Sequence, residues 1–203
     1  MERWPALDLA STIRHDGSGG VCDDLATVEG LARWLTELPG AGGTAGEPAL
    51  PVQGVGASEE LRLRITGLRA AARALFARTV SPGPASPADA HRLMPHEEAL
   101  ARLNAAAALE PVAPQLDWPA GGVPAATVLP SAADPDARLL AALARATITF
   151  LAGPERERLR ACTAPRCVRY FVKSHGRQEW CKPSCADRAR AARHYRRRVS
   201  SSG

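Results

Sequence analysis

The sequence of 203 residues has few aromatic side chains, no long apolar run and no common catalytic motif. Aromatic residues make up 4% of the chain. No apolar stretch reaches the ~18 residues that a membrane span needs, so we expect no membrane segment. The first residues lack the basic and apolar segments of a secretory leader, which favours a cytoplasmic protein. Residues 1–153 contain no phosphate-binding loop and no nucleophile motif. We therefore expect no enzyme activity.

Charge is distributed unevenly along the chain. Residues 154–203 carry 14 Lys/Arg against 4 Asp/Glu, whereas residues 1–153 carry 12 against 17. The net charge of +5 thus combines a mildly acidic body with a strongly basic end. Such a division indicates an anionic partner for the basic region alone.

Hydrophobic periodicity predicts an α+β protein whose N-terminal domain, residues 1–153, is mainly helical. The expected helices cover 23–38, 59–78, 97–109 and 134–152, with a short helix after Ser86-Pro87 and a small β-hairpin within 116–129. Ser58 stands where the second helix needs an N-cap. The Gly-, Ala- and Pro-rich stretch 39–57 is expected to be a flexible loop. Gly153-Pro154 should separate this domain from a second one, residues 154–203.

Four of the five cysteines lie within 24 positions, in the pattern Cys162-x4-Cys167-x13-Cys181-x3-Cys185. Structural Zn²⁺ takes four thiolate or imidazole ligands in a tetrahedron, and two closely spaced pairs can supply them. In a reducing compartment such a cluster indicates a metal. Two disulfides or unliganded thiols are the alternatives. Because four cysteines fill the zinc shell, we predict one structural Zn²⁺.

The residues around these cysteines predict a zinc finger of the treble-clef kind, with a knuckle, a hairpin and a helix. The hairpin is expected between the two cysteine pairs, with 168–172 and 178–180 as its strands. Ser184 is expected to cap the final helix, with Asp187 completing a capping box. An apolar stripe on that helix should pack on the hairpin aromatics Tyr170, Phe171 and Trp180. The stripe consists of Cys185, Ala189, Ala192, Tyr195 and Val199.

Basic residues surround the stripe, and we predict that they bind nucleic acid. Arg190, Arg193 and Arg197 share one helical face, and guanidinium groups presented in this way can neutralise phosphates or reach guanine edges. A solvated Arg-rich face is the alternative. The predicted contacts are Arg188, Arg190, Arg193, Arg196, Arg197, Arg198 and Lys173.

The C-terminal pattern resembles the CGNR zinc finger. The matching residues are Leu159-Arg160-x-Cys162-x4-Cys167-x3-Phe171, Trp180-Cys181-x3-Cys185-x2-Arg188 and Tyr195-x2-Arg198. The Cys-Gly-Asn-Arg of the family name stands here as Cys185-Ala186-Asp187-Arg188. Residues 6–12, Leu31-x2-Trp34-Leu35 and Leu103-Asn104 resemble the ABATE domain that precedes this finger in bacterial proteins. The resemblance implies a stress-related transcriptional regulator.

Two functions remain open from the sequence. The first is a DNA-binding transcriptional regulator, whose N-terminal domain senses an unknown small molecule or protein signal. The second is an RNA-binding or protein-interaction module in which zinc is purely structural. The oligomeric state does not follow from the sequence.

Overall fold

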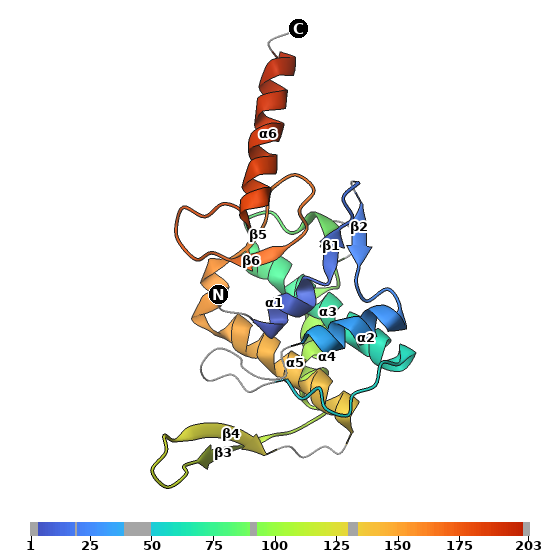
Figure 1. Ribbon diagram of the computed structural model, residues 1–203, viewed down its shortest axis with the longest axis vertical. Coiled ribbons are helices and arrows are strands. Elements are labelled where there is room, and N and C mark those ends of the chain that lie inside the picture. The colour runs from blue at the N-terminus through green and yellow to red at the C-terminus, as the bar shows by residue number, and fades with distance from the viewer. Residues whose placement is uncertain (1–3, 19, 39–49, 90–92, 130–133, 201–203) are drawn as a thin grey trace.

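The computed structural model describes residues 4–18, 20–38, 50–89, 93–129 and 134–200 (Figure 1). Within these ranges, helices build a body, and two-stranded antiparallel sheets are added to it, which confirms the expected α+β class. Most of the predicted loop 39–57 lies outside the described residues. Its described part, 50–57, contains neither helix nor strand.

A three-helix core forms the centre of the body. Helix α3 (Glu59–Val80) packs against α4 (His96–Ala107), which in turn packs against α5 (Pro135–Ala152). The N-cap prediction for α3 is confirmed, because Ser58 Oγ accepts a hydrogen bond from the Leu61 N–H at 3.1 Å. A short 3-10 helix, η1, follows α3 where a short helix was predicted. It spans Pro87–Asp89.

Leucines at helical spacing fill this core. Leu61, Ile65 and Leu68 of α3 meet Leu139 and Leu143 of α5 in one buried cluster. Burying each such side chain stabilises the fold by roughly 1.5–3 kcal/mol. The periodicity that predicted these helices therefore reflects the packing that stabilises them.

The N-terminal segment differs from its prediction. It forms α1 (Pro5–Ala10), a hairpin of β1 (Ile13–His15) and β2 (Val21–Asp23), and then α2 (Val28–Glu37). The predicted helix over 23–38 is thus wrong at its start, which is extended and paired with β1.

Long-range ion pairs explain this difference. Asp23 accepts two hydrogen bonds from the Arg69 guanidinium, at 2.5 and 2.6 Å, and Asp24 pairs with Arg14. Both carboxylates hold these arginines instead of facing the N-terminus of α2. Thr27 takes that position, and its hydroxyl accepts a hydrogen bond from the first turn of α2 at 3.1 Å.

A second hairpin extends from the body, as predicted. Strands β3 (Ala113–Asp117) and β4 (Ala125–Leu129) pair antiparallel, with Gln115 opposite Thr127. Figure 1 shows this hairpin reaching away from the helices. The residues of β3 are all exposed, so this hairpin contributes little to the core.

The cysteine-containing end begins with a short 3-10 helix, η2 (Pro154–Arg158). It continues through β5 (Leu159–Ala161) and β6 (Tyr170–Val172) to α6 (Pro183–Ser200). The predicted hairpin partner is wrong. Strand β6 pairs with β5, and the segment 178–180 forms no strand.

This pairing occurs because one face of the β5–β6 ribbon packs on the body. Leu159, Ala161 and Tyr170 share a buried cluster with Phe76 of α3 and Phe150 of α5. The Phe76 ring packs edge-on against both aromatic neighbours, with its centroid 5.6 Å from that of Tyr170 and 5.5 Å from that of Phe150. The apolar core therefore runs from the body into the cysteine-containing end.

Helix α6 leaves the molecule on the opposite side of the ribbon and projects outward (Figure 1). Its first turns are anchored, because Cys185 and Ala189 are buried. Its later residues are mostly exposed. None of the described helices combines the length and apolar character that crossing a membrane requires.

Candidate metal centre and nucleic-acid interface

The four predicted cysteines converge on one point. The Sγ atoms of Cys162, Cys167, Cys181 and Cys185 all lie within 4.8 Å of one another. The Sγ atom of Cys181 lies 3.7 Å from that of Cys167 and 3.5 Å from that of Cys185. A zinc tetrahedron with bonds of about 2.3 Å requires sulfur atoms about 3.8 Å apart. The cysteine geometry therefore fits tetrahedral zinc.

Two local structures bring the sulfur atoms together. Cys162 follows β5, and the chain turns at Arg166, whose φ of 63° lies in the left-handed region. This turn lets the Cys167 N–H donate to the Ala164 carbonyl at 3.0 Å. Cys181 precedes α6, and Cys185 lies in its first turn. The second cysteine pair therefore fixes the start of the helix.

The thiols of Cys162, Cys167 and Cys181 strongly shift one another's pKa values. Hydrogen bonding with Cys162 lowers the pKa of Cys167 to about 2, while hydrogen bonding with Cys167 raises the pKa of Cys162 to about 11. Hydrogen bonds with Cys162 and Cys167 also raise the pKa of Cys181. One thiolate thus suppresses ionisation of its neighbours. A divalent cation removes this conflict, since it stabilises thiolates.

The four thiolates would hold one structural zinc ion. They complete its coordination shell, so no position is left for a reacting water. The site is also shielded by packing, because Phe171 and Ala164 join the buried cysteines in one cluster, with Trp180 at its edge. The donor set and the packing both fit a zinc ion that stabilises the finger.

Arg188 has a role at the metal centre that the sequence analysis did not identify. It is half-buried, and its Nη2 donates to Cys185 Sγ at 3.1 Å. A zinc ion with four thiolates carries a net charge of −2, so a guanidinium at a ligand sulfur offsets part of that charge. The spacing of three residues on a helix was the available signal, because it places both side chains on one face.

The other predicted arginines lie along the projecting part of α6. Arg190, Arg193, Arg196, Arg197 and Arg198 are all exposed. The predicted common face is confirmed: Arg190, Arg193 and Arg197 line one shallow depression together with His194. With Arg188, the helix carries six arginines and one acidic residue, Asp187.

Some of these side chains already have partners. Arg190 forms an ion pair with Asp187, one turn earlier. The Arg193 guanidinium lies over the Trp180 ring, 5.5 Å from its centroid. Lys173 is not part of the helix face; its Nζ donates to the Gly176 carbonyl at 2.7 Å and holds the loop after β6. Arg190, Arg193 and Lys173 thus each make a contact within the finger.

The predicted packing of α6 needs two corrections. Ser184 is inside the helix rather than at its cap, because the Lys182 carbonyl already accepts the Cys185 N–H at 3.0 Å. Of the apolar stripe, Cys185 and Ala189 are buried but Tyr195 is 70% exposed, and the Val199 side chain lies outside the described part of the structure. Of the three aromatics expected beneath it, Tyr170 turns into the body instead. Tyr170 therefore gives α6 no cover, whereas Phe171 packs with Cys185 at the start of the helix.

A buried polar network joins the metal-binding end to α3. Tyr170 Oη donates to Asp89 Oδ2 at 2.7 Å, and the same carboxylate pairs with Arg73 at 2.8 Å. The Val168 carbonyl accepts a hydrogen bond from Ser86 Oγ at 2.8 Å and a longer one from Arg73. All these side chains are buried. The network therefore fixes the orientation of the finger relative to the body.

Comparison with known families agrees with this architecture. The ABATE family model, described as "Putative stress-induced transcription regulator", matches residues 4–154, and the CGNR zinc finger model matches residues 158–198. No curated protein matches the chain. The chain therefore belongs to the ABATE family and carries a CGNR zinc finger at its C-terminal end.

Proposed function

We propose that the protein is a DNA-binding transcriptional regulator that contacts the duplex through α6. The observation that carries this proposal is the projecting, arginine-rich helix whose first turn is fixed by a zinc ligand, Cys185. The family description as a transcription regulator supports it.

The dimensions of α6 suit a major groove. Its 18 residues span about 27 Å at 1.5 Å per residue. A helix with side chains is about 10–12 Å across, and the major groove of B-DNA is about 12 Å wide. Because the body lies at one end of the helix only, the exposed turns can enter a groove without a clash from the rest of the chain (Figure 1).

The arginines divide into groups by position. Arg190, Arg193 and Arg197 form the face that we assign to the groove, where they would also neutralise phosphates along its edges, and Arg196 and Arg198 flank it as further phosphate contacts. Arg188 and Lys173 act mainly within the finger, where they already hold Cys185 and Gly176. To contact DNA, Arg190 must leave its ion pair with Asp187, and Arg193 must leave the face of the Trp180 ring. Each of these surface interactions is worth about 1 kcal/mol or less.

Equilibrium binding to duplex DNA tests the proposal. The variant carrying Arg190→Ala, Arg193→Ala and Arg197→Ala should bind much more weakly than the unaltered chain. A matched control carries Arg156→Ala, Arg158→Ala and Arg160→Ala, which removes the same charge from exposed positions before the knuckle. Strong duplex binding by the first variant, or an equal loss in the control, contradicts the assignment of α6.

An RNA-binding or protein-interaction role is the second candidate, and one observation favours it. Trp180 and the exposed Tyr195 line a groove of about 550 Å³ between α6 and the knuckle, which is the turn from Cys162 to Cys167. Aromatic side chains of this kind can stack on unpaired bases. Tyr170 and Phe171 are buried, so they offer no stacking surface. Tighter binding to single-stranded RNA than to duplex DNA would favour this alternative.

The body completes the proposed regulator. We infer that it senses a small-molecule or protein signal, has no catalytic activity of its own, and acts in the cytoplasm where the DNA is. The continuous core and the Tyr170–Asp89 contact support a mechanical connection between the body and the finger. A conformational change in the body could reach α6 through these contacts.

A further inference from the structure

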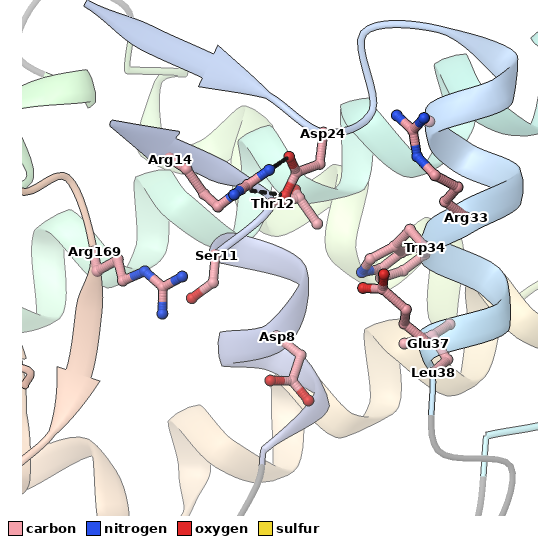
Figure 2. Close-up of a pocket in the computed structure, with 11 residues that line it drawn as sticks. Asp8, Ser11, Thr12, Arg14, Asp24, Arg33, Trp34, Glu37, Leu38 and Arg169 are labelled. Atoms are coloured by element: carbon pink, nitrogen blue, oxygen red, sulfur yellow. Dashed lines mark hydrogen bonds and ion pairs between the residues drawn. The ribbon is translucent and has the colours of Figure 1, made fainter. Parts of the chain in front are cut away.

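A polar pocket of about 480 Å³ lies where the N-terminal elements meet the finger (Figure 2). Its walls come from α1, β1, the start of the loop before α2, and α2 itself, and Arg169 of the finger closes one side. The volume lies within the range of about 300–1,000 Å³ that is usual for small-molecule sites. The pocket therefore has the size for a metabolite.

The charges in the pocket are balanced, but they are not all paired. Arg14 forms an ion pair with Asp24 at the rim. In contrast, the Arg169 guanidinium and the Glu37 carboxylate have no hydrogen-bond or ion-pair partner within the described part of the chain, and Glu37 acts on Arg14 only at longer range. Figure 2 shows them on opposite sides of the pocket, with Arg169 pointing toward Ser11 and Glu37 beside the Trp34 indole.

Other polar groups line the same pocket. Ser11 adds a hydroxyl near the arginine, and the Asp8 side chain projects from α1 (Figure 2). Trp34 forms part of the opposite wall and is 8% exposed, with its indole nitrogen on the pocket side. A ligand would thus find the Arg169 guanidinium on one side, the Glu37 carboxylate on the other, and an aromatic surface, with Arg33 also lining the α2 side of the cavity.

We propose that this pocket binds a small zwitterion, meaning a metabolite with one carboxylate and one amino group. A guanidinium binds a carboxylate through two parallel hydrogen bonds. Glu37 would receive the ammonium group. A purely anionic ligand would bring a like charge toward Glu37, and a purely cationic ligand would leave Arg169 without a partner.

The position of Arg169 links such a ligand to the metal centre. Its carbonyl accepts a hydrogen bond from the Cys162 N–H at 2.9 Å, and Cys167 lies two residues before it. The neighbouring Val168 and Tyr170 hold the body through the buried polar network. A ligand that contacts Arg169 and α2 together thus bridges the body and the finger. The regulatory meaning of the site rests on the proposed function, whereas ligand binding itself does not.

Thermal shift and titration calorimetry on the zinc-loaded chain of 203 residues test the proposal. The probes are the proteinogenic amino acids together with β-alanine, γ-aminobutyrate and δ-aminovalerate, because these vary the distance between the charges. At roughly a hundredfold excess over Kd, a true ligand should raise the Tm by about 5–10 °C. Butyrate and butylamine each carry only one charge and should bind at least about tenfold more weakly than a matched zwitterion.

Two variants and a control locate the binding. Arg169→Ala and Glu37→Gln should each weaken the zwitterion at least about tenfold, while Arg160→Ala, an exposed arginine on the same ribbon outside the pocket, should not. The proposal is overturned if no zwitterion of the panel binds, if a singly charged analogue binds equally well, or if Arg169→Ala binds normally. These results do not depend on DNA, so they fail or succeed separately from the proposed function.

Discussion

Replacement of Tyr170 by Phe should destabilise the whole chain, because its hydroxyl joins the finger to the body. The hydroxyl donates to Asp89 at 2.7 Å and accepts the Ser86 N–H at 3.3 Å. The ring itself would remain in place against Phe76. Arg73 would still neutralise Asp89, so the variant removes the hydrogen bonds without leaving an unpaired buried charge.

The magnitude follows from these contacts. A hydrogen bond to a charged group contributes about 1.5–3 kcal/mol. For a protein of this size, each kcal/mol shifts the Tm by about 2–4 °C. The Tyr170→Phe variant should therefore melt about 3–12 °C lower. If the core is continuous, calorimetry should show this as one cooperative transition that moves as a unit.

Tyr195→Phe is the matched control, because Tyr195 is the other tyrosine of the chain and its side chain is 70% exposed. It should leave the Tm nearly unchanged. Two separate transitions, of which only one responds to Tyr170→Phe, would refute the reasoning. So would a decrease in Tm no larger than that of the control.

Three further predictions concern the metal centre and the buried tyrosine. Cys181→Ser should abolish stable zinc binding and unfold the finger, which metal analysis and near-UV circular dichroism would show; one zinc retained per chain would contradict this. Arg188→Ala should weaken zinc binding about 10–100-fold in a chelator competition, whereas Arg190→Ala should not, since Arg190 contacts Asp187 and no cysteine. Burial, together with the Asp89 charge, raises the pKa of Tyr170 above its ordinary value of 10.0. The stabilising contribution of its protonated form is therefore complete below pH 10 and is lost as the pH rises toward the raised value. Urea titrations at alkaline pH should show a smaller loss for Tyr170→Phe than for the unaltered chain.

The sequence was most informative where local interactions determine structure. The Ser58 cap, the leucine periodicity of α3 and α5 and the cysteine spacing all act over a few residues, and each led to a correct prediction. The spacing of Arg188 from Cys185 is also a local signal, but the charge of the helix alone predicts a nucleic-acid contact for Arg188 and not its bond to Cys185.

The errors arose where a distant partner changed the local preference. Asp23 and Asp24 resemble a helix start, but Asp23 is bound by Arg69, which lies 46 residues away. Strand β6 would have a nearby partner at 178–180, yet Tyr170 binds Asp89, 81 residues earlier, and β6 pairs with β5 instead. The contribution of α2 and Arg169 to the pocket was hidden for the same reason, because these walls lie far from α1 in the sequence.

The salt dependence of duplex DNA binding tests the central claim most directly. If the five exposed arginines of α6 each neutralise one phosphate, the logarithm of the binding constant should fall against the logarithm of salt concentration with a slope near −4.5. Replacing Arg190, Arg193 and Arg197 with Ala should reduce the steepness of that slope by about 2.7. The account predicts this change for the helix variant and little change for the variant at Arg156, Arg158 and Arg160. An unchanged slope in the helix variant would contradict the claim that α6 binds DNA.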